Sequence, residues 1–186
     1  MSLLADCSDI VLDEIRHAIG LVNETQIDQL IEGLLTADQV FVVGVGRVML
    51  SLQAFAKRLN HIGIRTHCVG DIDEPAITNR DLLIVGSGSG ESAVPVAIAR
   101  IAKQHGARVA HIGSNPESSL RPLTDIFVRI PVKTKLDRSD EVRSQQIMSS
   151  LFEQALFILG DVVALAIAKR KDLNIGLLWR YHANLE

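Results

Sequence analysis

Five short apolar runs recur along the chain with longer amphipathic segments between them, and this alternation restricts the fold more than any other feature. The runs cover residues 40–43, 66–69, 82–85, 108–112 and 126–130, and each is followed by glycine or proline. Continuous apolar runs of this length are typical of strands buried on both faces. Helical patterns cover residues 11–19, 25–35, 50–62 and 93–105. Because such alternation produces parallel strands joined by right-handed crossovers, the sequence predicts a three-layer α/β/α sandwich around a five-stranded parallel sheet.

The length and composition fit a single domain. The chain has 186 residues, of which 47% are hydrophobic and 22% are charged, and this is enough to enclose one full core. We predict N-terminal helices up to residue 38, an α/β core over 39–131, an exposed loop or lid over 132–143, a long helix over 144–171 and a tail over 172–186. The loop is predicted because its charges are interleaved without an apolar period.

Composition also argues against several classes of protein. The net charge is −3 and the basic residues are scattered, which gives no electrostatic footprint for nucleic acid. The longest apolar run, residues 162–168, is far shorter than the roughly 18 to 20 residues of a membrane span. Only two cysteines are present, and Cys–His zinc spacing is absent, which fits a reducing compartment. We therefore expect a cytoplasmic protein without nucleic-acid partners, membrane contact or a metal site.

The long C-terminal helical segment predicts self-association. From residue 151 to residue 168 its apolar positions lie all round the helix, so it must be buried on more than one side. A domain this small offers one sheet to pack against. We therefore expect part of this helix to contact another subunit of a homo-oligomer.

A serine-rich glycine turn indicates the chemistry of the ligand. Gly86-Ser87-Gly88-Ser89-Gly90-Glu91-Ser92 follows the apolar run 82–85 and precedes the helical segment 93–105. Such a turn presents backbone N–H groups and hydroxyls at the positive end of a helix, which suits a phosphate or carboxylate. The sequence therefore predicts a phosphorylated small molecule as ligand, held by Ser87, Gly88, Ser89 and Ser92, although any of these serines could instead be a plain N-cap.

A second glycine turn, Gly44-Val45-Gly46-Arg47, follows the first strand. Ligands of open α/β sheets bind beyond the carboxyl ends of the strands, where strand order reverses, so the two turns could border one crevice. Gly46 and Arg47 would then contact the ligand; alternatively, the glycines only make tight corners and Arg47 is a surface residue. Neither turn has the third glycine of a dinucleotide fingerprint, and no Walker pattern is present, which disfavours nucleotides.

Several segments together resemble a known family. They are Ala54-Phe55-Ala56-Lys57-Arg58-Leu59-Asn60-His61-Ile62-Gly63, Ser87-Gly88-Ser89-Gly90-Glu91-Ser92, Gly113-Ser114-Asn115-Pro116 and Leu151-Phe152-Glu153-Gln154. From about residue 10 to residue 169 the chain resembles SIS-domain sugar-phosphate isomerases, most closely the 6-phospho-3-hexuloisomerases. The resemblance implies a flavodoxin-like fold and interconversion of D-arabino-hex-3-ulose 6-phosphate and fructose 6-phosphate without metal or organic cofactor. It also implies composite active sites in a homotetramer, with a dimer as the alternative.

One position departs from the family pattern. The turn after the first strand usually reads glycine-x-glycine-arginine-serine, and here Val48 occupies the serine position. Either Ser51 or a backbone N–H replaces the missing hydroxyl, or the sugar substrate differs.

Two residues are our candidates for catalysis. Moving a carbonyl to the next carbon needs a base for the proton alpha to it, and Glu153 lies among apolar residues that would partly desolvate its carboxylate. His61 would handle protons at the sugar oxygens or stabilise the enediolate. The alternatives are an ordinary solvated or salt-bridged glutamate and a histidine at a helix C-terminus. The competing function is a sugar-phosphate sensor without catalysis.

Overall fold

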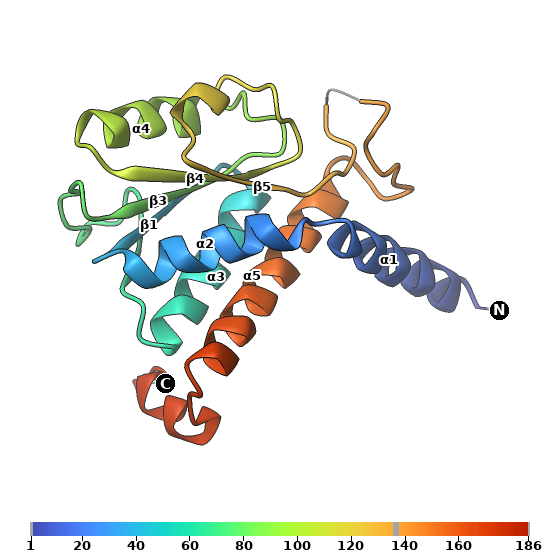
Figure 1. The fold of residues 1–186 in the computed structure, drawn as a ribbon. Coiled ribbons are helices and arrows are strands. Elements are labelled where there is room, and N and C mark those ends of the chain that lie inside the picture. Colours follow the sequence, from blue (N-terminus) through green and yellow to red (C-terminus); the bar gives the residue numbers. More distant parts are fainter. Residues whose placement is uncertain (1, 136–137, 186) are drawn as a thin grey trace.

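The chain forms a parallel five-stranded sheet between two helical layers, in a computed structural model that describes residues 2–135 and 138–185 (Figure 1). The strand order is β2-β1-β3-β4-β5, and all neighbouring strands run in parallel. The strands are β1 (Val40–Val43), β2 (Thr66–Cys68), β3 (Leu82–Gly86), β4 (Arg108–Gly113) and β5 (Ile126–Arg129). The predicted three-layer α/β/α sandwich is confirmed, and each predicted strand agrees with an observed one to within one residue at either end.

The helices divide unequally between the two faces of the sheet. One face is covered by α4 (Ala93–Gln104), which packs with the 3₁₀ turn Arg121–Leu123 over a small apolar cluster that includes Val43 and Val85. The other face carries the larger core, formed against Val42 and Ile84. Its helices are α1 (Leu3–Gly20), α2 (Glu24–Thr36), α3 (Arg47–His61) and α5 (Ser150–Arg170). Successive strand residues therefore pack on opposite faces, as the period of a β-strand requires.

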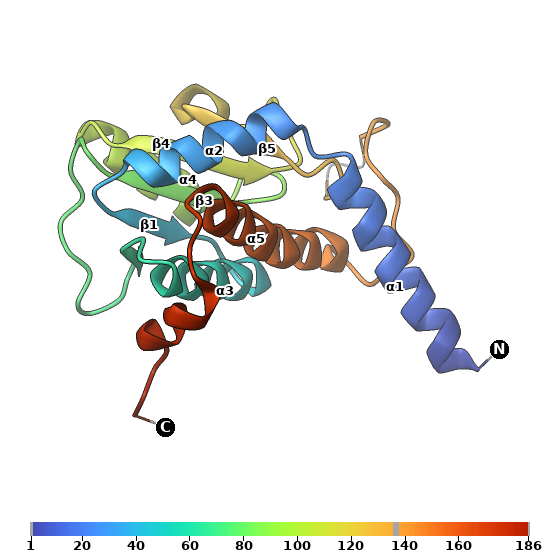
Figure 2. The same ribbon diagram turned by 60° about the horizontal axis from the view of Figure 1, so that its bottom comes forward.

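Three helix boundaries differ from the predicted ones. Helix α3 begins at Arg47 rather than at residue 50, directly after Gly46, whose positive φ of 57° allows a sharp turn out of the strand. Helix α5 begins at Ser150, so residues 144–149 are irregular. Helix α1 extends back to Leu3 and projects from the body in both views (Figures 1 and 2), with only Ala18 buried.

Helix α5 is the central helix of the larger layer. It has the length and mean hydropathy, 1.9, of a membrane span, but 56% of that stretch is buried inside the protein. It lies beside α3 in both views, and a Cβ added at Gly160 would come within 3.1 Å of three Phe55 atoms, so a larger residue there would require the ring to shift. The other side of α5 remains exposed and apolar, at Phe157, Ile158, Val162 and Leu165.

The segment 132–143 is a loop with several exposed residues, as expected, but the prediction of exposure is wrong at three positions. Val132, Thr134 and Glu141 are buried, and Val132 pairs with Val142 in an isolated bridge. The local charge pattern could not reveal this, because the burial comes from contacts with distant residues. Residues 136–137 of the predicted lid lie outside the described residues.

His111 on β4 supports the serine turn from beneath. Its side chain is fully buried, and its Nε2–H donates to the main-chain oxygen of Ser87 at 2.9 Å. A Cβ at Gly113 would lie 2.3 Å from that Nε2, so glycine is needed there for the bond to form. Burial lowers the pKa of His111 to about 4, and nearby Arg121 adds to the shift. His111 is thus a structural residue.

This burial predicts a specific pH dependence of stability. Because the folded pKa lies below the ordinary value of 6.5, the unfolded chain binds the extra proton between pH 6.5 and pH 4. The contribution of neutral His111 is therefore complete above pH 6.5 and is lost as the pH falls towards 4. Between pH 7.5 and pH 5, the wild type should lose about 2 kcal/mol more stability than His111→Gln. Urea unfolding at both pH values measures this difference; equal losses in the two proteins would contradict it.

Candidate functional site

A cavity of about 280 Å³ lies at the carboxyl ends of β1 and β3 and is bordered by both glycine turns. These strands are neighbours, yet β1 leads to β2 at one edge of the sheet and β3 leads to β4 on the other side. The cavity therefore lies at the switch point of the strand order, where α/β folds bind ligands. Its lining residues are Val45, Gly46, Arg47, Val48, Gly86, Ser87, Gly88, Ser89, Ser92, Thr134, Lys135, Ser149, Phe152 and Glu153. The expected single crevice is present.

Three helix N-termini meet at this cavity without side-chain caps. The N-cap residues of α3, α4 and α5 are Gly46, Ser92 and Ser149, which all line the cavity, and none makes a capping hydrogen bond. By contrast, Ser2 and Asn23 cap α1 and α2 through their side chains. The first N–H groups of a helix have no partner within the helix and carry its positive dipole end, so an anion is the natural ligand here.

The serine turn is held in a fixed shape by its own hydroxyls. Ser87 Oγ accepts from the N–H of Gly90 at 3.1 Å and lies 3.4 Å from Ser92 Oγ. Ser89 Oγ accepts from the N–H of Glu91 at 3.3 Å. Gly90 has φ of 69°, and a Cβ there would meet Ser118 at 2.3 Å, so this position requires glycine.

Glu91 faces away from the cavity. Its carboxylate accepts from the side-chain hydroxyl and the N–H of Ser119, at 2.5 and 2.8 Å, and these hydrogen bonds lower the pKa of Glu91. No acidic side chain of the turn therefore opposes an anion.

Arg47 and Glu153 form an ion pair across the cavity. Arg47, the first residue of α3, donates through Nε to Glu153 Oε2, while Glu153 Oε1 accepts from Ser149 Oγ at 3.1 Å. The side chain of Glu153 is only 12% exposed, against 65% for Arg47. Glu153 is therefore salt-bridged, as the simpler interpretation allowed, yet it lies inside the cavity beside the uncapped helix ends.

Ser51 does not replace the hydroxyl that Val48 lacks. Its Oγ donates to the main-chain oxygen of Glu153 at 2.9 Å and lies 3.4 Å from that of Arg47, so it links α3 to α5 outside the cavity lining. Val48 itself packs tightly, since a Cβ on Gly86 would meet its Cγ1 at 2.9 Å. Of the expected alternatives, the backbone N–H groups at the start of α3 and a different sugar substrate remain.

His61 lies away from this cavity. It is the last residue of α3, and the 14-residue rise from Arg47 to His61 corresponds to about 21 Å along the helix. It lines a separate cavity of about 430 Å³ near the C-terminal tail, where its ring stacks on His182 at 5.5 Å. Burial, followed by Lys57, Arg58 and His182, lowers the pKa of His61. Within the described chain, its buried Nε2 has no hydrogen-bond partner.

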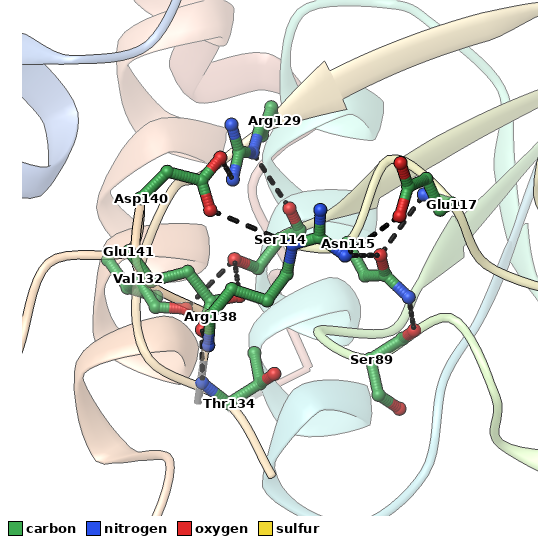
Figure 3. A network of polar contacts seen from close by, with 10 residues as sticks. All are labelled: Ser89, Ser114, Asn115, Glu117, Arg129, Val132, Thr134, Arg138, Asp140 and Glu141. Atoms are coloured by element: carbon green, nitrogen blue, oxygen red, sulfur yellow. Dashed lines mark hydrogen bonds and ion pairs between the residues drawn. The ribbon is translucent and has the colours of Figure 1, made fainter. Parts of the chain in front are cut away.

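Sequence reasoning missed Thr134 and Lys135 in the wall of the first cavity. They belong to the loop after β5, which a polar network ties to the end of β4 (Figure 3). In this network the buried Glu141 lies with its Oε1 2.8 Å from Ser114 Oγ, and Asn115 donates through Nδ2 to the main-chain oxygen of Ser89 at 3.2 Å. The one available sequence signal was that this loop follows the carboxyl end of a predicted strand. Over residues 2–135 and 138–185, no cluster of three His, Cys, Asp or Glu side chains could hold a metal ion.

Comparisons with known proteins agree with this architecture. A family model described as the SIS domain matches residues 33–159. The chain is 36% identical over 176 residues to a Bacillus subtilis protein named 3-hexulose-6-phosphate isomerase, with 95% of each covered. It is 39% identical over 177 residues to a Mycobacterium gastri protein of the same name, with 95% of this chain and 88% of that protein covered.

A solved structure shows the same similarity in three dimensions. It comes from Methanococcus jannaschii, and its description infers a molecular function of 3-hexulose-6-phosphate isomerase. It matches with a TM-score of 0.84 at 28% identity, covering 97% of this chain and 99% of that one. With the family model spanning more than half of its length and two relatives above 30% identity, this chain belongs to the SIS domain family.

Proposed function

We propose that the protein is a 3-hexulose-6-phosphate isomerase, which interconverts D-arabino-hex-3-ulose 6-phosphate and D-fructose 6-phosphate. The observation that carries the proposal is one cavity in which three uncapped helix N-termini lie beside a largely buried carboxylate. An anion site next to a base is what an isomerase of a phosphorylated sugar needs. The similarity to relatives named 3-hexulose-6-phosphate isomerase selects the sugar.

The serine turn would hold the phosphate. Hydroxyls of Ser87, Ser89 and Ser92, with the N–H groups at the start of α4, supply neutral donors to its oxygens. Arg47 adds a cation with an exposed, adaptable side chain at the same cavity. Phosphate binding at one end would fix the sugar carbons relative to Glu153 at the other.

Glu153 would move the proton between carbons. Its carboxylate takes the proton from C2 of the 3-ulose, the C–H electron pair forms the C2=C3 bond, and the C3 carbonyl oxygen becomes the enediolate oxygen. The protonated carboxyl then returns the proton to C3 while the carbonyl forms at C2. The oxygen on C2 loses a proton and that on C3 gains one, so a second group must carry a proton between the two oxygens.

His61 of a neighbouring subunit would serve as that second group. The length of α3 separates His61 from Glu153 of its own subunit, so it can act only in another subunit's cavity. Exposed apolar side chains on α5 and on the projecting α1, among them Phe157, Leu165 and Leu12, offer surface for such association. We propose a cytoplasmic homo-oligomer, with a tetramer favoured over a dimer.

Replacing Glu153 by glutamine should separate catalysis from binding. Glu153→Gln keeps the size of the side chain but removes the base, so turnover should fall at least about 100-fold. Phosphate binding should persist or tighten, because Arg47 loses its anionic partner. The measurements are formation of fructose 6-phosphate from the 3-ulose and calorimetric titration with inorganic phosphate.

Asp28→Asn is the matched control for this substitution. Asp28 is also a carboxylate paired with an arginine, Arg170, but it lies outside the cavity lining, so turnover should stay within about twofold. Unchanged turnover in Glu153→Gln would remove Glu153 from the mechanism. Phosphate binding without turnover in the wild type would instead favour a sensor.

Mixed oligomers test whether His61 acts across subunits. Glu153→Gln and His61→Asn should each be inactive alone, because every site lacks one group. If the two variants are co-expressed and assemble at random, about a quarter of the sites receive both native residues and activity returns. Differently tagged subunits allow the hybrids to be isolated before the assay. Isolated hybrids without activity would show that the two residues do not complete one another's sites.

A further inference from the structure

The charged residues that line the cavity differ in whether they form an ion pair. Its charged lining residues are Arg47, Lys135 and Glu153. Arg47 and Glu153 neutralise one another, so neither offers net charge to a ligand in the free protein. Lys135 is exposed and makes no hydrogen bond or ion pair with any residue in the described part of the chain. Of the three charged lining residues, Lys135 is therefore the one without an ion pair in the described part of the chain.

Lys135 is carried by a loop that rests directly on the serine turn. A Cβ added at Gly88 would lie 3.1 Å from Thr134 Cγ2 and 3.4 Å from the ring of Phe152. Thr134 therefore packs against the middle of the turn, and the next residue is Lys135. Lys135 therefore lines the cavity directly after a residue that contacts the serine turn.

A buried carboxylate holds the loop in this place (Figure 3). Glu141 is 7% exposed, and its Oε2 accepts from the N–H of Thr134 at 3.4 Å and of Arg138 at 3.1 Å. Its Oε1 lies 2.8 Å from Ser114 Oγ at the end of β4. A buried carboxylate without such partners costs free energy, so moving the loop away from these hydrogen bonds would be unfavourable.

The same network reaches the serine turn. Arg138 Nη1 donates to Asn115 Oδ1 at 3.3 Å, and Asn115 Nδ2 donates in turn to the main-chain oxygen of Ser89 (Figure 3). Lys135 and the serine turn are thus braced against a common set of side chains.

We propose that Lys135 binds the phosphate of the substrate, as the cation that completes the serine turn. The inference deepens the proposed isomerase, because it assigns a further residue to the substrate site. The hydroxyls and N–H groups of the serine turn supply neutral donors to a phosphate dianion, and a flexible ammonium on the adjoining loop adds a positive charge to them. Glu141 acts as a positioning residue for this lysine.

Titration of Lys135 variants with inorganic phosphate and with fructose 6-phosphate tests the assignment. Lys135→Met should bind both about tenfold more weakly than the wild type, since a charged hydrogen bond is lost. Lys135→Arg should retain most of the affinity. Lys133→Met is the control. It removes the same charge from a lysine two positions earlier in the loop, and Lys133 does not line the cavity, so this variant should bind within about twofold of the wild type. In turnover, Lys135→Met should raise KM with little change in kcat.

The contrary outcomes are equally specific. Equal phosphate affinity in Lys135→Met and the wild type would overturn the assignment. An equal loss in Lys133→Met would also overturn it, because it would show only a non-specific electrostatic effect of positive charge on the loop. A loss confined to kcat would place the lysine at the enediolate instead. A wild type that binds neither ligand would remove the phosphate site itself. Since inorganic phosphate binds without turnover, failure of isomerisation alone would reject the proposed reaction and leave the lysine assignment intact.

Discussion

The structure depends on three helices that begin at the same place without side-chain caps. Helices α3 and α4 begin at the carboxyl ends of the neighbouring strands β1 and β3, and α5 begins at the same cavity. Unpaired N–H groups at a helix start are tolerated where water or a ligand can reach them. Glycine at this end of the sheet has a separate, steric reason, because side chains at Gly86 or Gly88 would crowd Val48 or Thr134.

In the proposed mechanism, one ion pair joins a residue of phosphate binding to the catalytic base. Arg47 pairs with Glu153 in the free protein, although a substrate phosphate would be a second partner for the same guanidinium. The proposed reaction therefore needs enough positive charge in the cavity to bind a phosphate dianion while Glu153 remains free to take a proton. The length of α3 keeps His61 out of the cavity of its own subunit. In the proposed mechanism, association of subunits would therefore be needed to bring His61 to the site.

Much of this could be predicted from local pattern. The strands were found nearly to the residue, because buried runs such as 82–85 are apolar whatever surrounds them. The two glycine turns also identified the end of the sheet where the cavity lies. The burial of Glu141 could not be found, because its partners Ser114 and Thr134 are specified by tertiary contacts. The separation of His61 from Glu153 could be predicted only in part. The helix fixes the distance from His61 to Arg47, but Glu153 comes next to Arg47 through a tertiary contact.

The most direct test of the proposed chemistry follows hydrogen exchange on fructose 6-phosphate. The substrate is incubated with wild-type protein in deuterium oxide, and proton NMR follows the positions on either side of the carbonyl. The proposed enediolate between C2 and C3 predicts loss of the C3 proton signal with both C1 protons retained. Exchange at C1 with C3 intact would indicate an aldose–ketose isomerase. Absence of exchange at both positions and of any 3-ulose product, in protein that binds the sugar phosphate, would contradict the proposed catalysis altogether.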